Sequence, residues 1–178
     1  MKKLKNDEVS IKFPMLGEIE GCQFVVYADA SFKNLAGGGS QGGYVVFIRG
    51  SNGKQSLLAW QSRKLKRVVK STLAAETLAL MEGVECAFLC KTTLKELLGI
   101  DADLPIRAYS DSKSLVDSVH SSKTLEDNRL KIDICVLRDY LRLGEVKHIE
   151  WVDTKEQLAD VLTKSGASAQ NLLDVLSQ

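Results

Sequence analysis

The fold is decided by residues 24–62, FVVYADASFKNLAGGGSQGGYVVFIRGSNGKQSLLAWQS. Three apolar, β-rich runs lie in this stretch, at residues 24–28, 44–49 and 57–62. A turn-rich segment separates the first two runs, and Asn52-Gly53 lies between the second and the third. Asn-Gly between apolar runs is a strong signal for a tight hairpin. The stretch therefore predicts three antiparallel strands joined by hairpins.

The turn-rich segment contains a glycine pattern that is typical of dinucleotide binding. Gly37, Gly39 and Gly42 match G-x-G-x-x-G after a strand. That motif requires a helix directly after it, because the phosphate lies at the helix N-terminus. A strand-like run follows here, so we interpret the glycines as part of a hairpin loop.

From Ser71 onward the apolar spacing changes to the helical period, and a helix is expected over residues 71–98 with Gly99 as its stop. Further strands are predicted at residues 106–110 and 146–152, and further helical segments at residues 112–120, 125–143, 156–163 and 168–176. Hairpin-linked strands followed by strand–helix crossovers predict an α/β fold. We expect a mixed five-stranded sheet, three antiparallel strands and then parallel strands, with helices on both faces.

Composition places the chain among single globular domains, with 178 residues, 44% hydrophobic and 26% charged. No apolar run approaches the roughly 18 residues of a membrane span, so we expect no membrane partner. Four cysteines form no CxxC pair, which favours structural thiols in an intracellular, reducing setting. Residues 1–22 are weakly patterned and predict a lead-in or a join to an upstream domain, whereas residues 23–178 predict the folded domain.

A basic run stands out because the net charge of the whole chain is only +1. The sequence RKLKRVVK, residues 63–70, has five cations and no acid. Such a run is usually a solvated face, but beside chemically active carboxylates it would follow a phosphate backbone. The cations are Arg63, Lys64, Lys66, Arg67 and Lys70.

Four acidic residues occupy positions from which they can meet. Asp29 follows the first apolar run, and Asp111 follows the predicted strand at 106–110. If those strands are parallel neighbours, both carboxylates emerge at one sheet edge, where open α/β sheets bind ligands. Glu76 lies close to the core-facing side of its helix, where burying a carboxylate without a partner reduces the stability of the fold. Asp160 lies among the apolar residues of QLADVLTK.

Each acid alone has an ordinary explanation as a turn residue, a helix cap, an ion-pair partner or a helix N-terminal residue. Converging carboxylates, however, repel one another and raise their own pKa values unless cations neutralise them. A cluster rich in oxygen and free of imidazole and thiol suits Mg²⁺ or Mn²⁺. Two such ions, about 3.5–4 Å apart, can bind the attacking and leaving oxygens of a phosphodiester.

Four segments carry a family resemblance: YADAS (27–31), STLAAETLAL (71–80), YSDSKSLV (109–116) and VKHIEWVDTKEQLADVLTK (146–164). In this order they resemble the RNase H domain of copia-type LTR retrotransposon polyproteins, over about residues 24–165. The resemblance implies a ribonuclease H-like fold and endonucleolytic hydrolysis of RNA in RNA/DNA hybrids with two Mg²⁺ ions, for which Mn²⁺ substitutes. By motif, the catalytic and metal-binding residues would be Asp29, Glu76, Asp111 and Asp160.

The resemblance also implies substrate contacts and partners. Ala30 and Ser31 would approach the RNA backbone and its 2′-hydroxyls. Ser71 and Thr72 would contact a DNA phosphate, although both also suit an ordinary helix N-cap. An upstream reverse transcriptase domain in a polyprotein, and an intracellular location within virus-like particles, are the expected context.

The sequence departs from the cellular enzymes of this family in two ways. The loop at residues 153–157, DTKEQ, lacks the histidine that those enzymes carry, and we interpret His120 and His148 as structural. A basic protrusion helix is also missing, so the basic run or an upstream domain would have to bind the substrate. Asp153 is the alternative to Asp160 as the fourth carboxylate.

Two other functions stay open. A catalytically silent nucleic-acid-binding or scaffold domain would keep the fold, although the presence of all four carboxylates argues against it. A transposase or integrase is disfavoured because, as the resemblance has it, those enzymes place their glutamate on a late helix. Here Glu76 lies between the third and fourth predicted strands.

Overall fold

A mixed five-stranded sheet forms the centre of the molecule. The computed structural model describes residues 11–35 and 37–177. The strands are β1 (Gln23–Leu35), β2 (Gly39–Arg49), β3 (Gln55–Lys64), β4 (Ile106–Ser110) and β5 (Val146–Trp151). They lie in the order β3-β2-β1-β4-β5, antiparallel from β3 to β1 and parallel from β1 to β5. The predicted mixed sheet is confirmed.

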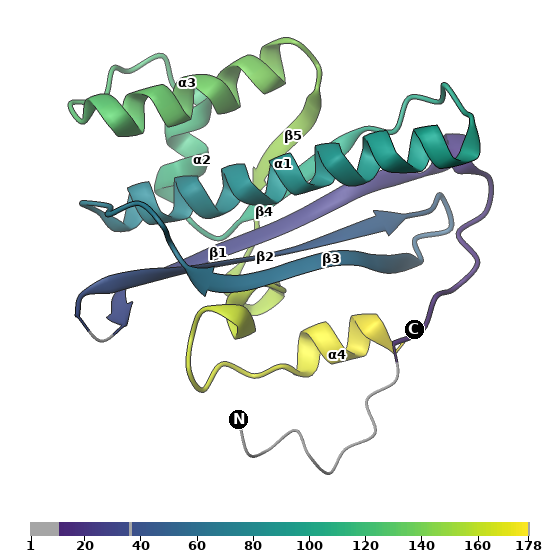
Figure 1. The fold of residues 1–178 in the computed structure, drawn as a ribbon, viewed down its shortest axis with the longest axis horizontal. Helices are drawn as coiled ribbons and strands as arrows, with labels where there is room; N and C mark the ends of the chain where they lie inside the picture. The colour runs from purple at the N-terminus through teal and green to yellow at the C-terminus, as the bar shows by residue number, and fades with distance from the viewer. Residues whose placement is uncertain (1–10, 36, 178) are drawn as a thin grey trace.

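Helices cover both faces of the sheet, as predicted (Figure 1). The helices are α1 (Thr72–Leu98), α2 (Lys113–His120), α3 (Asn128–Arg142) and α4 (Gln170–Leu176). The first three lie over one face, where Val26 and Leu80 belong to the larger core, and α4 lies under the other. On that second face Val25 and Phe47 form a smaller core, against which residues of α4 pack.

The long helix α1 begins and ends with the predicted signals. The Ser71 hydroxyl accepts a hydrogen bond from the Ala74 N–H at 3.1 Å, and Gly99 takes the left-handed conformation at φ 62°. Gly83 lies where the helix packs tightly on the sheet, since a Cβ there would stand 2.8 Å from Val26 Cγ1. This close approach explains a glycine inside a helix, at a cost of about 1 kcal/mol relative to alanine.

The first hairpin is longer than predicted. Residues 29–43 are rich in turn formers, yet β1 runs to Leu35 and β2 begins at Gly39. Pairs such as Asp29 with Gly43 continue the ladder, because backbone pairing in the sheet outweighs local propensity. Asp29 therefore lies inside β1 rather than after it. Gly39 and Gly42 lie within β2 rather than in the predicted hairpin loop, and the chain continues after Gly42 as a strand and not as the helix that a dinucleotide-binding turn requires.

The prediction of a helix over residues 156–163 is wrong. The chain forms two single 3₁₀ turns there, Thr154–Glu156 and Asp160–Leu162. The Gln157 amide separates them, because its Nε2 donates to the Ala28 carbonyl at 3.0 Å and its Oε1 accepts from the Ala159 N–H at 3.2 Å. These bonds attach the segment to the sheet and interrupt the helical pattern.

The part of the lead-in that the structure describes packs against the domain. The Lys12 N–H donates to the Leu176 carbonyl, and the Asn52 side chain donates to the Met15 carbonyl, both at 2.9 Å. Residues 1–10 lie outside the described residues, and the predicted boundary after residue 22 stays a prediction.

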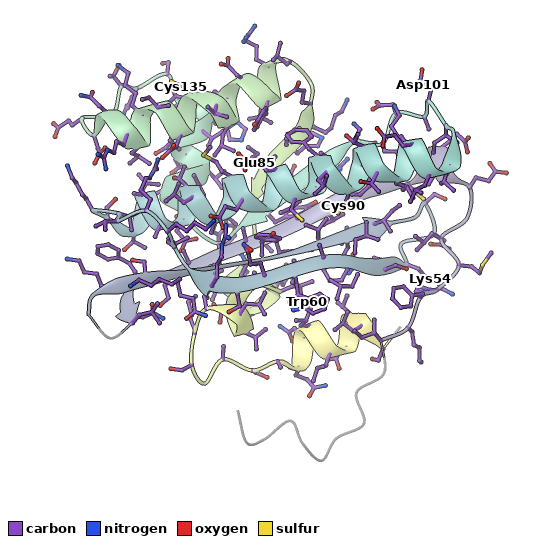
Figure 2. The ribbon with its side chains drawn as sticks, in the orientation of Figure 1. Lys54, Trp60, Glu85, Cys90, Asp101 and Cys135 are labelled. Carbon is purple, nitrogen blue, oxygen red and sulfur yellow. The ribbon has the colours of Figure 1, made fainter. Side chains whose placement is uncertain are left out.

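Two composition-based expectations concern cysteines and membranes. All four cysteines are free, and Figure 2 shows Cys90 on α1 and Cys135 on α3. Among the described residues, no helix combines the length and the apolar character that crossing a membrane requires.

Candidate functional site

Three acidic side chains meet at one edge of the sheet. The parallel register of β1 and β4 pairs Tyr27 with Tyr109, and Asp29 and Asp111 each lie two residues further along. Glu76, near the start of α1, joins them from above the sheet. Each of the three carboxylates offers an oxygen, and these oxygens lie within 4.8 Å of one another. The structure thus brings together three of the four predicted carboxylates, which we call the acidic triad.

Glu76 is the least satisfied member of the triad. Its side chain is 5% exposed, and among the described residues its Oε2 has no hydrogen-bond partner. Burial, together with the charges of Asp29 and Asp111, raises the pKa of Glu76 to about 9. A buried carboxylate oxygen without a donor, beside two more carboxylates, fits a hard divalent cation with oxygen ligands.

The other two members are held by hydroxyl donors. Asp29 is fully buried, which raises its pKa, although a hydrogen bond from Thr163 Oγ1 and the charge of Lys164 partly offset that rise. Asp111 is half-buried and its Oδ2 accepts from Thr154 Oγ1 at 2.9 Å. The Trp151 indole also donates to the Asp111 backbone carbonyl, at 3.0 Å.

Asp160, the fourth predicted carboxylate, lies outside the triad and has a cationic partner. Its carboxylate contacts Lys164 Nζ, which also lies 3.3 Å from Asp29 Oδ1. Burial alone would lower the pKa of Lys164, but the hydrogen bond with Asp160 and the charge of Asp29 raise it overall. The alternative residue, Asp153, is exposed and accepts from the Lys155 N–H, so that it caps the first 3₁₀ turn.

Comparison with known proteins gives the fold. No protein-family model matches the sequence. The structure is similar to RNase H1 from the halophilic archaeon Halobacterium salinarum NRC-1, with a TM-score of 0.56 at 19% identity, covering 85% of this chain and 98% of that one. It is also similar to LC11-RNase H1 in complex with an RNA/DNA hybrid, with a TM-score of 0.55 at 17% identity, covering 79% and 94%. The chain has the ribonuclease H-like fold.

A third similar structure places the same fold inside a larger protein. The foamy viral protease-reverse transcriptase in complex with an RNA/DNA hybrid gives a TM-score of 0.51 at 21% identity. The match covers 92% of this chain and 22% of the viral chain. A ribonuclease H-like domain of this kind therefore also occurs within a reverse transcriptase chain.

The basic run, residues 63–70, does not form one continuous cationic face. Arg63 pairs with Glu82 at 2.9 Å, and Arg67 pairs with Asp133, which is buried on α3. Their charges are therefore neutralised within the protein. The exposed cations of the run are Lys64, Lys66 and Lys70.

The remaining predicted contact residues differ in accessibility. Ala30 is buried and Ser31 half-buried on β1, whereas Thr72 is exposed at the start of α1. Ser71 is the N-cap of α1, so its ordinary structural role is present. The histidines lie outside the triad: a ring nitrogen of His120 is 2.8 Å from the Ile149 carbonyl.

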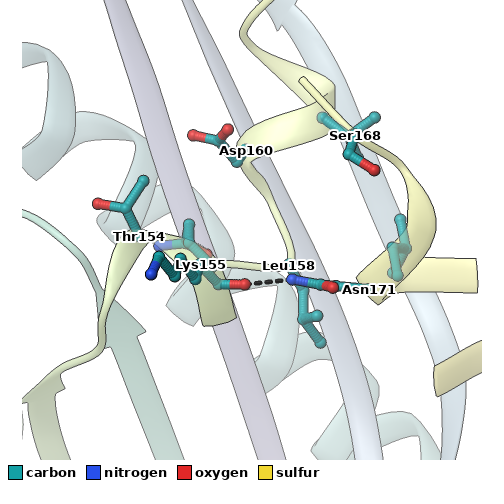
Figure 3. A pocket seen from close by; sticks show the side chains of 9 residues that line it. Thr154, Lys155, Leu158, Asp160, Ser168 and Asn171 are labelled. Atoms are coloured by element: carbon teal, nitrogen blue, oxygen red, sulfur yellow. Dashed lines mark hydrogen bonds between the residues drawn. The ribbon is translucent and has the colours of Figure 1, made fainter. Parts of the chain in front are cut away.

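A pocket of about 330 Å³ lies beside Asp160 (Figure 3). The two 3₁₀ turns form one wall, and Ser168 and Asn171 form the other. The Asn171 amide donates to the Lys155 backbone carbonyl, which holds the two walls together. None of the three triad residues lines this pocket, although Thr154, which donates to Asp111, does.

Sequence reasoning missed the residues that hold the carboxylates. Thr154, Thr163 and Lys164 lie in the tail segment that carries the family resemblance, but nothing in their spacing indicates that they reach Asp29 or Asp111. One local signal was visible, since Asp160 and Lys164 are four residues apart, the distance of an ion pair on a helical turn.

Proposed function

We propose that this chain is a metal-dependent ribonuclease H that hydrolyses the RNA strand of RNA/DNA hybrids. The observation that carries the proposal is the convergence of Asp29, Glu76 and Asp111, with an unpartnered buried oxygen on Glu76. The same fold occurs in RNase H1 proteins, one of them solved with a hybrid. Carboxylates that hold two divalent ions can support phosphodiester hydrolysis.

The acidic triad would hold Mg²⁺, with Mn²⁺ as a substitute, and Asp160 would contribute to a second ion. Bound divalent ions supply a water of lowered pKa and charge stabilisation for the leaving oxygen. The protein's own part is to fix the ligands: Thr154 orients the Asp111 carboxylate, and Thr163 orients that of Asp29. Glu76 lies on the buried side of α1 and is 5% exposed, so its position is fixed by the packing around that side of the helix.

Substrate would be bound through its backbone. Lys66 and Lys70 are exposed directly before α1, where the helix N-terminus at Ser71 and Thr72 also favours a phosphate. Ser31, which is half-buried, would approach the RNA strand and its 2′-hydroxyls, and Ala30, whose side chain is buried in the core, could do so only through its backbone. Because backbone contacts and groove shape do not read bases, we expect little sequence preference.

The test uses hybrids whose RNA strand is labelled at one end. With Mg²⁺, the protein is expected to cut the RNA internally, and to leave single-stranded RNA, duplex DNA and the DNA strand of the hybrid intact. EDTA should stop the cutting and excess Mg²⁺ restore it. Tight binding of the hybrid without any cutting would instead support the silent, nucleic-acid-binding alternative.

We further propose that the domain belongs to a retroelement. The support is the copia-type resemblance of the four segments and the occurrence of the fold in the foamy viral protease-reverse transcriptase. A reverse transcriptase domain upstream in the same polyprotein would then deliver the hybrid. That setting implies an intracellular location, within virus-like particles.

The exposed lysines and the paired arginine are predicted to respond differently to substitution. A Lys66→Met/Lys70→Met variant should bind hybrid more weakly and with a shallower dependence on salt, by about one unit of slope for each lost phosphate contact. Its melting temperature should stay unchanged. Arg67→Met should instead lose about 2 kcal/mol of stability, because it leaves the buried Asp133 carboxylate unpaired.

Fluorescence anisotropy over a series of salt concentrations, together with urea unfolding, checks both effects. Lys54→Met serves as the matched control, because Lys54 is exposed at the opposite end of β3 (Figure 2). An unchanged salt slope in the double-lysine variant would contradict this assignment of the substrate track.

A further inference from the structure

Lys164 lies between two carboxylates that come from distant parts of the chain. Its Nζ is 3.3 Å from Asp29 Oδ1 and contacts Asp160 Oδ1 directly. The side chain of Asp29 is almost completely buried, whereas that of Lys164 is 39% exposed. The ammonium therefore neutralises a buried charge from a position that is open to solvent on one side.

The two sides of the acidic site differ in whether a protein cation lies beside the carboxylate. Toward Asp160, the Asp29 carboxylate meets a protein cation and the hydroxyl of Thr163. Toward α1, the described residues provide no partner for the buried Oε2 of Glu76. One side of the site thus already holds a positive charge, and the other side lacks one.

We propose that Lys164 is a built-in counter-ion that competes with a divalent cation for the Asp29–Asp160 side of the site. A cation on the Glu76–Asp111 side meets no such competitor and binds first. A second cation binds on the Asp160 side only when the Lys164 ammonium has moved out. The inference rests on the proposed function in one respect, that the acidic triad binds divalent cations.

The local structure allows this exchange without movement of the backbone. The Thr163 side chain is 2% exposed and bonded to Asp29, and the Lys164 N–H donates to the Asp160 carbonyl at 3.0 Å. Those contacts fix the backbone at the second 3₁₀ turn. The Lys164 side chain, a compact charge on four flexible carbons, can leave by changing rotamer alone.

Removing the ammonium should therefore have two effects of opposite sign. Lys164→Met in the full chain should lower the melting temperature in EDTA, because the Asp29 carboxylate loses its counter-ion. It should also tighten the binding of the second cation by about tenfold, because the competitor is gone. A lysine that only stabilised the fold would give the first effect without the second.

The experiment is a titration with Mn²⁺ alone, followed by electron paramagnetic resonance and calorimetry without nucleic acid. The wild type should show one tighter and one weaker ion, and Lys164→Met two ions of closer affinity. Lys164→Arg, which keeps the charge, should retain the weak second site. Lys155→Met is the matched control, because Lys155 lies in the same tail segment and makes no ion pair among the described residues.

A second measurement covers the case in which Lys164→Met fails to fold. Lysines of the wild type are labelled by ¹³C reductive methylation, and the Lys164 signal is assigned by its loss in Lys164→Arg. That signal should shift with the second equivalent of Mg²⁺ and stay unchanged with the first. The proposal is overturned if Lys164 does not respond at saturating Mg²⁺, or if Lys164→Met binds the second ion no more tightly than the wild type. Absence of any bound ion in the wild type would overturn the proposed metal site as well, whereas unaltered two-ion binding would overturn only the role of Lys164.

Discussion

Asp111→Asn is expected to lower the kcat/KM of hybrid cleavage at least about a thousandfold, which corresponds to about 4 kcal/mol of transition-state stabilisation. The amide keeps the volume of the side chain but removes the negative charge that a divalent cation needs. Asp111 is only half-buried, and Thr154 can still donate to the amide oxygen, so the fold should be kept. Initial rates on a labelled hybrid, with Mg²⁺ at saturation, measure the effect.

The matched control for this variant is Asp117→Asn. Asp117 is exposed on α2, is not a member of the acidic triad, and undergoes the same replacement of a carboxylate by an amide. Its cleavage rate should equal that of the wild type. Residual cleavage by Asp111→Asn within about tenfold of the wild type would refute a role for Asp111 in metal binding, provided that circular dichroism shows an intact fold.

Glu76→Gln is expected to stabilise the metal-free protein increasingly as the pH rises. The pKa of Glu76 is raised from 4.5 to about 9, so the folded state holds its proton more tightly than the unfolded state does. Stability therefore falls as the pH rises from about 4.5 to 9, by up to about 1.4 kcal/mol for each unit. Glutamine does not titrate, so the variant escapes this loss, and the gap between the two proteins should reach a few kcal/mol at pH 9.

Urea unfolding at pH 5, 7 and 9 in EDTA measures this gap, and a second series with Mg²⁺ should reduce or reverse it. A bound metal ion favours the ionised Glu76 carboxylate and so stabilises the folded wild type. It stabilises the glutamine variant less, because an amide is a weaker ligand. Glu85→Gln is the control, because Glu85 is exposed on the same helix (Figure 2). A gap that does not change with pH would show that Glu76 carries no such shift.

The sequence predicted the architecture well where apolar spacing decides it. The helix over residues 71–98 and the Asn52-Gly53 turn need only local signals. A mixed sheet follows from hairpins succeeded by crossovers, whereas the pairing of β1 with β4 comes from the structure. The first hairpin was underestimated, because residues 29–43 become strand only through pairing between β1 and β2. Composition alone does not reveal such a ladder.

For the site, the meeting of Asp29 and Asp111 was predicted only on the condition that their strands are parallel neighbours, a condition that β1 and β4 fulfil. Helical spacing placed Glu76 close to the core-facing side of α1, and the structure brings it to the two aspartates. The surroundings of Asp160 could not be predicted, because they depend on the bonds of Gln157 that break the expected helix. The basic run shows the same limit. Its pairing with Glu82 and Asp133 links residues that are far apart in sequence, so charge counting overestimated the free cations.

The missing side chain at Gly83 has a consequence for the width of the acidic site. Any residue with a Cβ there would have to move Val26 or Tyr44, or else lift α1 away from the sheet. Glu76 is two helical turns earlier on α1, so lifting the helix would draw its carboxylate back from the two aspartates. A glycine at position 83 thus lets α1 pack close enough to the sheet for carboxylates from two layers of the protein to meet.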